Sequence, residues 1–186
     1  MPNDEISDSI TKAGKYLSEG QFSAAESLIN SVIERSPKNP QAHHLSGVLN
    51  FKRGSYQRAA SAFNHYLLLD PDNIAVLNNL AVTYQKIKKH AQARSVLIKA
   101  IRLDKRHVNS YQNLMTIELN QKKFGSVIRV FNEAKRLPSG LECNVIAASA
   151  YRALGKSQKA KNLLQLYLAA HKNDINALNN LGNIER

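Results

Sequence analysis

The sequence is poor in the residues that build covalently linked or irregular folds. Its 186 residues include one cysteine, Cys143, no tryptophan, 8 glycines and 5 prolines. A single cysteine excludes an internal disulfide framework and a cysteine-cluster metal site. Few glycines and prolines argue against a loop-rich or all-β chain. The long segments between them are rich in Ala, Leu, Lys and Gln, so the composition predicts a helical protein.

The sequence also lacks a secretion signal and a membrane-spanning run. Its first five residues, Met1-Pro2-Asn3-Asp4-Glu5, are acidic and polar, whereas a signal peptide begins with basic and then apolar residues. No run approaches the roughly 18 apolar residues that a membrane helix needs. Together with the single cysteine, these absences lead us to expect a soluble cytoplasmic protein with no membrane association.

No motif of catalytic or metal-binding chemistry is recognisable. The chain has no glycine-rich phosphate loop and no Gly-x-Ser-x-Gly elbow. The adjacent His43 and His44 would point about 100° apart on a helix, and the other histidines lie singly, so none has the spacing of a metal pair. We predict no enzyme activity, no cofactor and no metal, and we interpret Cys143 as a buried packing thiol.

The chain has a formal net charge of +12, and the charge is unevenly distributed. Residues 1–93 carry 10 Lys/Arg against 8 Asp/Glu, whereas residues 94–186 carry 16 against 6. Such an excess either covers a solvated helical surface or serves an anionic partner such as nucleic acid. The basic residues are not interleaved with aromatic residues as in single-strand binders, which argues against nucleic acid.

The sequence repeats itself with a period of about 34 residues. Residues 71–81 align without a gap to residues 172–182, and residues 20–25 match residues 54–59. Small residues, aromatic residues, a turn glycine, alanines and a closing proline recur in register. In the first repeat these positions are Ala13, Tyr16, Gly20, Phe22, Ala25, Ile29 and Pro37. Later repeats carry, among others, Gly47, Gly54, Tyr56, Ala59, Phe63, Pro71, Ala81, Tyr84, Ala93, Ala148, Tyr151, Gly155 and Ala160.

This period and pattern resemble the tetratricopeptide repeat family. The resemblance implies an all-α fold, a right-handed α-solenoid of stacked helix-turn-helix hairpins. It predicts a single domain over residues 1–186, made of repeats 1 to 5 and a final first helix. Their approximate ranges are 6–39, 40–73, 74–107, 108–140, 141–174 and 175–186. Since that last helix reads as an ordinary internal one, we expect the chain to be the N-terminal part of a longer protein; a polar terminal cap is the alternative.

Several positions carry structural expectations of their own. Gly47, Ala81, Ala148 and Gly182 should let neighbouring helices approach closely, and Lys88 should take the place of the turn glycine in repeat 3. Asn50, Glu118 and Glu185 stand where other repeats have tyrosine, so each must reach solvent or find a partner. Repeat 4 is one residue short and has Pro138 in its exit, where we expect a change of superhelix angle.

The resemblance also implies where a ligand would bind. In this family the first helices line a concave groove that holds an extended peptide or a partner helix. Helical spacing assigns residues to that face. The predicted groove residues are His44, Val48, Phe51, Lys52, Asn78, Val82, Gln85, Lys86, Asn109, Gln112, Thr116, Asn120, Glu142, Val145, Ser149, Arg152, Asn176, Asn179 and Asn183. Side-chain amides dominate this set and can bind a peptide backbone of any sequence.

Two further comparisons refine the expected partner. Asn79, Asn113 and Asn180 resemble the asparagine ladder of O-GlcNAc transferase, although they could equally satisfy neighbouring backbone. The chaperone-binding members of the family need a lysine on the first helix to hold a C-terminal carboxylate. This sequence has no such lysine and therefore predicts no carboxylate clamp. At that position stand Ile10, His44, Asn78, Gln112 and Val145.

Three functions remain after this reading. The first is a protein-interaction scaffold with a protein or peptide ligand. The second is a substrate-recruiting arm of a larger glycosyltransferase- or sulfotransferase-type enzyme. The third, weaker one is binding of an anionic partner through the basic second half. The apolar ends of a solenoid also predict homodimer formation.

Overall fold

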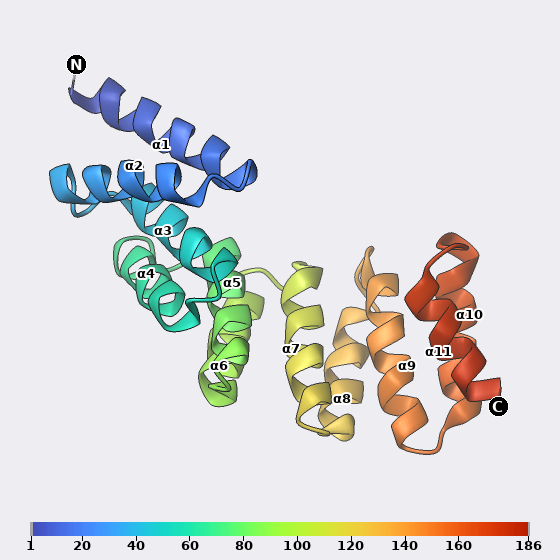
Figure 1. The fold of residues 1–186 in the computed structure, drawn as a ribbon. Helices are drawn as coiled ribbons and strands as arrows, with labels where there is room; N and C mark the ends of the chain where they lie inside the picture. The colour runs from blue at the N-terminus through green and yellow to red at the C-terminus, as the bar shows by residue number, and fades with distance from the viewer. Residues whose placement is uncertain (1, 186) are drawn as a thin grey trace. The chain divides into compact units, whose positions relative to one another are not determined.

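The computed structural model describes residues 2–185, and every regular element in that range is a helix (Figure 1). The first six are α1 (Pro2–Ser18), α2 (Phe22–Arg35), α3 (Pro40–Lys52), α4 (Tyr56–Leu69), α5 (Ile74–Lys86) and α6 (His90–Leu103). They are followed by α7 (Val108–Asn120), α8 (Phe124–Ala134), the 3-10 helix η1 (Gly140–Cys143), α9 (Asn144–Ala153), α10 (Ser157–Ala170) and α11 (Ile175–Glu185). The prediction of an all-α repeat fold is confirmed.

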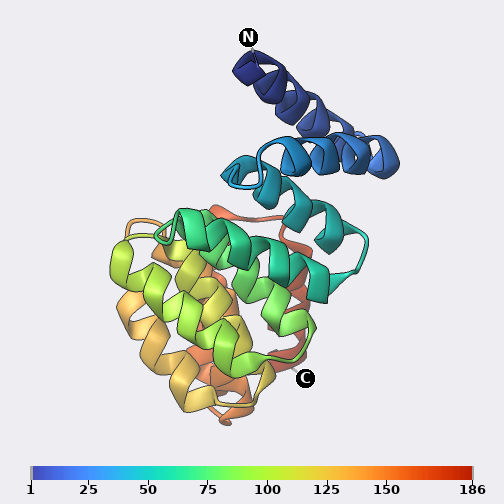
Figure 2. The ribbon, with the colours of Figure 1, turned by 90° about the vertical axis from the view of Figure 1, so that its left-hand side faces the viewer.

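The helices form two compact bodies, which we call the N-terminal body (Met1–Val96) and the C-terminal body (Leu97–Arg186). In the N-terminal body, α1 packs on α2, α3 on α4, and each hairpin stacks on the next through α2 with α3 and α4 with α5. Figure 2 shows the blue hairpin of α1 and α2 followed by α3. In the C-terminal body, α7 packs on α8, α8 on α9, α9 on α10 and α10 on α11 (Figure 1). The organisation as a single domain of five repeats and a final first helix stays a prediction, and so does the handedness.

Side-chain caps start several of the first helices. Asn39 Oδ1 accepts a hydrogen bond from the Ala42 amide at 3.0 Å, and Asn73 Oδ1 accepts one from the Val76 amide at 3.2 Å. Asp174 plays the same part at the start of α11. Each cap satisfies a backbone N–H that has no partner within the helix. Asn39 and Asn73 are 34 residues apart. The start of each of these repeats is therefore set by a hydrogen bond to a residue three positions away.

The turn between the two helices of a hairpin has a left-handed residue at a regular position. Gly20, Gly54 and Gly155 have φ of 76°, 75° and 69°. Lys88 and Lys122 take the same place with φ of 60° and 58°. The predicted role of Lys88 is confirmed, and Lys122 is an equivalent that the pattern did not single out. A lysine there bears strain that a glycine avoids.

Small residues permit close helix packing at three of the four predicted positions. Ala81 and Ala148 are buried, and a Cβ added to Gly47 would overlap the ring of Phe63 on α4. Gly182 is different: it is exposed, and a Cβ there would meet no atom within 4 Å. The expectation for Gly182 was wrong, because no neighbouring helix of the described chain lies against that face of α11.

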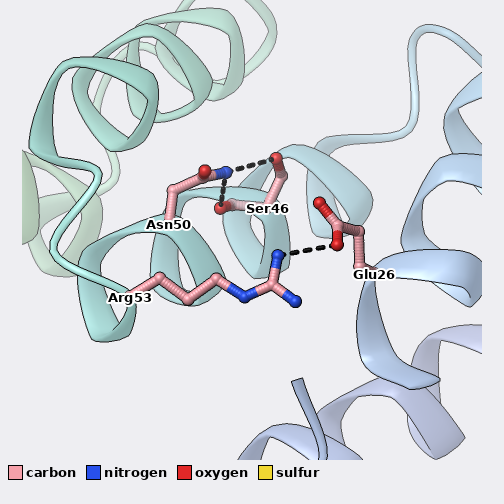
Figure 3. A network of polar contacts seen from close by, with 4 residues as sticks. All are labelled: Glu26, Ser46, Asn50 and Arg53. Carbon is pink, nitrogen blue, oxygen red and sulfur yellow. Dashed lines mark hydrogen bonds and ion pairs between the residues drawn. The ribbon is translucent and has the colours of Figure 1, made fainter. Parts of the chain in front are cut away.

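One of the three polar residues at tyrosine positions, Asn50, bonds to its own helix. In Figure 3, Asn50 Nδ2 donates to the Ser46 carbonyl oxygen at 2.8 Å, one turn earlier on α3. Beside it, Arg53 Nη1 pairs with Glu26 Oε2 at 2.6 Å and ties the end of α3 to α2. Glu118 lies on α7 and is buried. Asn50 therefore finds its hydrogen-bond partner on its own helix. The side chain of Glu185 lies outside the described residues.

The junction of repeats 4 and 5 departs from regular helix packing. Helix α8 has 11 residues and α9 has 10, whereas α4 has 14 and α3 has 13. The segment between α8 and α9 contains Pro138 and η1, so a 3-10 turn precedes α9. A Cβ on Gly140 would overlap the carbonyl oxygen of Ala134 and the backbone of Lys135, so only glycine fits where this segment crosses the end of α8. The predicted change of superhelix angle here stays a prediction.

Candidate functional site

A hollow in the N-terminal body lies between the first helices of two successive repeats. We call it the groove hollow; it has a volume of about 300 Å³. Its lining residues are Val48, Phe51 and Lys52 of α3, Phe63 of α4, and Asn79 and Val82 of α5. The lining is mostly apolar, with one amide and one ammonium group. Apolar hollows with a few polar groups are the usual form of a binding site.

The walls of the groove hollow are held by aromatic packing. The ring of Phe51 lies edge-on to that of Tyr56, with centroids 5.3 Å apart. Phe63 is only 1% exposed and closes the floor. Since these rings are packed against their own hairpins, the hollow is formed before any ligand binds.

His44 lies one turn before Val48 on α3 and packs among rings. Its centroid is 6.1 Å from that of Phe63 and 6.0 Å from that of Tyr66. Burial lowers the pKa of His44 below its ordinary value, because the charged imidazolium loses hydration there. At neutral pH this predicted groove residue therefore acts as a neutral aromatic surface.

The two asparagines of α5 have different surroundings. Asn78 is 8% exposed, and its Nδ2 donates to the Ile74 carbonyl oxygen at 2.9 Å. Asn79 is half-buried and lines the groove hollow, and its side-chain amide forms no hydrogen bond with any residue in the range 2–185. Of this pair, Asn79 is the one placed to meet a ligand. The sequence placed Asn78 among the groove residues and left Asn79 open between an asparagine ladder and a backbone partner, whereas it is Asn79 that lines the hollow.

The predicted residues of the C-terminal body fall into two groups. Gln112 Nε2 donates to the Glu142 carbonyl oxygen at 3.2 Å, and Thr116 Oγ1 donates to the Gln112 carbonyl oxygen at 2.8 Å, so both contribute to packing. A second group is exposed, and its members line neither the groove hollow nor the loop hollow. They are Asn109, Asn120, Arg152, Asn176, Asn179 and Asn183. On α5, Gln85 is half-buried and Lys86 is exposed. The peptide-binding role of all these residues stays a prediction.

A second, larger hollow lies at the junction of repeats 4 and 5. We call it the loop hollow; its volume is about 630 Å³. Its lining residues are Phe131, Lys135, Leu137, Pro138, Gly140, Leu141, Asn144, Tyr151, Lys159, Asn162, Leu163 and Leu166. None of them is among the predicted groove residues. The sequence signal for the loop hollow is the short fourth repeat, from which we expected only a change of superhelix angle.

The remaining reactive side chains were compared with the geometry of a metal site and of a reactive thiol. No three His, Cys, Asp or Glu residues between positions 2 and 185 come together as metal ligands. Cys143 is fully buried, as predicted, and burial raises its pKa to about 11, with the nearby Glu142 charge adding to the shift. Its thiolate is scarce at neutral pH, so this thiol is inert. The described helices also include none with the length and apolarity needed to cross a bilayer.

Stacked hairpins with a recurring left-handed turn and a hollow between successive first helices define a helical-repeat solenoid protein. Two models of the tetratricopeptide repeat match the chain, one over residues 12–74 and one over residues 50–117, which together span more than half of it. The chain belongs to the tetratricopeptide repeat family.

Known proteins match this chain at low sequence identity. Protein NPGR2 of Arabidopsis thaliana is 28% identical over 102 residues, which are 53% of this chain and 14% of that protein. A tetratricopeptide repeat protein of Parabacteroides merdae superposes with a TM-score of 0.83 at 14% identity, over 97% of this chain and 72% of that one. YrrB, described as a TPR protein with an unusual peptide-binding site, gives 0.73 at 16% identity over 92% and 89%. The chain spans 12 to 14% of the length of the curated relatives that it matches.

Proposed function

We propose that this chain is a protein-interaction module that binds an extended peptide across the groove hollow of its N-terminal body. The observation that carries the proposal is the hollow itself, since it joins α3 and α5 with an apolar floor and polar edges. An apolar side chain of the peptide enters between Val48 and Val82. The role is binding rather than catalysis.

The polar residues at the edge define how the peptide is held. The Asn79 amide has two N–H donors and a carbonyl oxygen, which match the alternating groups of an extended backbone. Lys52 is exposed at the rim and attracts a carboxylate near the apolar anchor. The site therefore favours a peptide with a medium-sized apolar residue next to Asp or Glu. The comparison with YrrB supports a peptide ligand, since that fold relative is described by its peptide-binding site.

A selection from a displayed random peptide library against the whole chain tests the proposal. Affinities of the enriched peptides are then measured for the natural chain, Val82→Glu, Asn79→Ala and the control Ala75→Glu, which places the same charge on an exposed position of α5. Val82→Glu should weaken binding at least about tenfold, because it places a carboxylate in an apolar hollow. Asn79→Ala should weaken it about two- to tenfold, the effect of losing one or two hydrogen bonds.

The control variant shows whether a loss of peptide affinity is specific to the groove hollow. Ala75→Glu should bind like the natural chain. The thermal midpoint of Asn79→Ala should stay unchanged, because the amide of Asn79 forms no hydrogen bond within the described residues. Peptides that bind all four proteins equally would show that the groove hollow is not the site. Whether the module also acts as the recruiting arm of a larger enzyme stays a separate prediction.

A further inference from the structure

The loop hollow exists because the fourth repeat ends early. Helix α8 stops at Ala134, and the chain then crosses its end through Leu137, Pro138 and Gly140 before α9 begins. An irregular segment therefore lies between α8 and α10, the second helices of repeats 4 and 5, where a further turn of helix would otherwise stand. The resulting space of about 630 Å³ is in the size range of ligand pockets in proteins.

Two lysines stand over two aromatic rings in this hollow. Lys135 Nζ is 5.8 Å from the centroid of Phe131, and Lys159 Nζ is 5.9 Å from that of Tyr151. These distances are in the range of cation–π attraction, which holds each long side chain over its ring. Both lysines are exposed, and no acidic residue lines the hollow. Two positive charges thus face an apolar interior with no negative charge of the lining to neutralise them.

Helix α10 presents a continuous stripe to the same hollow. Lys159, Asn162, Leu163 and Leu166 follow one another at helical spacing, so they share one face. Leu166 is 60% exposed, although it lies beside apolar residues. A large exposed leucine at the edge of an apolar hollow provides area that a partner can cover.

We propose that the loop hollow is a second docking site, which takes an acidic amphipathic segment of a partner protein. Large apolar side chains of that segment enter the hollow and cover Leu166, and its Asp or Glu residues meet Lys135 and Lys159. The charge of the chain favours this occupant, because residues 94–186 carry 16 Lys/Arg against 6 Asp/Glu. A basic or neutral segment would leave the two ammonium groups without counter-charges in a half-apolar setting.

This site is independent of the groove hollow. The two sets of lining residues have no member in common, and each set lies within a different body. The loop hollow is lined by α8, the segment that follows it, α9 and α10, whereas the groove hollow is lined by α3, α4 and α5. A chain with both sites would hold two different segments at once.

The experiment is a display selection of random peptides on the natural chain, with counter-selection on the variant Lys135→Glu, Lys159→Glu. Peptides that survive should pair large apolar residues with Asp and Glu. Their affinity should fall at least about tenfold with the lysine pair variant and with Leu166→Glu, and it should decrease as salt rises. The matched control is Leu68→Glu, which changes a leucine that is 80% exposed on α4 and should leave the affinity unchanged. All four substituted residues are exposed, so folding should not be disturbed.

Several results would overturn the proposal. One is a selection that yields no acidic-apolar peptide, and another is a set of peptides that bind Leu166→Glu as well as the natural chain. A loss of the same peptides with Val82→Glu would assign them to the groove hollow instead. Sedimentation of the natural chain as a dimer that Leu166→Glu dissociates would identify a second copy as the occupant. Tight binding of a single-stranded oligonucleotide that the lysine pair variant abolishes would assign the hollow to nucleic acid.

Discussion

Gly47 on α3 lies against the ring of Phe63 on α4 so closely that a single added methyl group would overlap it. Phe63 is also the floor of the groove hollow, and it is 1% exposed. The absence of one side chain therefore sets both the packing of a hairpin and the depth of a candidate binding site. Several measurable consequences follow from this pair and from the other regularities of the fold.

Gly47→Ala should destabilise the N-terminal body. Overpacking a filled core costs about 1 to 3 kcal/mol, which outweighs the roughly 1 kcal/mol gained when alanine replaces glycine in a helix. Gly182→Ala is the matched control, because it has the same repeat position with open space around it. Urea unfolding should give a lower midpoint for Gly47→Ala and an equal or higher one for Gly182→Ala. A lowered midpoint for both would contradict the packing explanation.

Lys88→Gly and Lys122→Gly should each stabilise the chain. Both lysines hold a left-handed backbone that L-residues with a Cβ adopt at a cost of about 1 to 2 kcal/mol. Part of this gain is offset by the greater freedom of glycine in the unfolded chain, so we expect about 0.5 to 1 kcal/mol. Thermal or urea unfolding measures the change. Lys89→Gly and Lys123→Gly are adjacent controls without positive φ and should not stabilise.

Asn73→Ala should cost about 1 to 2 kcal/mol of unfolding free energy. Asn73 caps α5 through Val76, and its Nδ2 also donates to Tyr66 Oη at 2.9 Å and to Asp70 Oδ2 at 3.2 Å. The loss of the cap alone accounts for about 1 kcal/mol. Asn73→Ser keeps a cap acceptor and places no charge beside Asp70, so its stability should lie between those of the natural chain and Asn73→Ala. Equal stabilities of Asn73→Ala and the natural chain would refute this role.

The chain should lose stability as the pH rises from about 8.5 toward 11. Burial raises the pKa of Cys143 to about 11, whereas an unfolded cysteine releases its proton near 8.5. In this window the unfolded state loses the proton and the folded state retains it, so unfolding becomes more favourable. Burial also raises the pKa of Tyr66, Tyr111 and Tyr167, which extends the loss to higher pH.

Urea titrations at several pH values should show this decline, and Cys143→Ala should reduce it. The same burial predicts that iodoacetamide at pH 8 modifies Cys143 slowly in the native chain and rapidly in urea, as mass spectrometry would show. Equal alkylation rates in both conditions would mean that the thiol is accessible in the folded chain.

Much of the fold follows from local chemistry that is legible in the sequence. Pro37, Gly20 and Gly54 mark helix ends by their own backbone restrictions, and Asn39 and Asn73 start helices by bonds to residues three positions away. The alternation of small and large residues at a fixed period indicates hairpins that pack on their neighbours. These features need no knowledge of distant contacts, and the predicted helices and the family are therefore confirmed.

The tertiary structure decided the features that depend on a neighbour. A step of one residue turns a side chain by about 100°. Helical spacing assigned Asn78 to the groove, but in the structure Asn78 is buried and Asn79 lines the hollow. Gly182 has the residue type for close packing, but close packing needs a second helix against it. The loop hollow arises where the segment after α8 lies between α8 and α10. The sequence period shows which residues are helical, but it does not show the path of this irregular segment. The sequence determined which faces pack; the tertiary structure decided which gaps remain open, because a gap belongs to several elements at once.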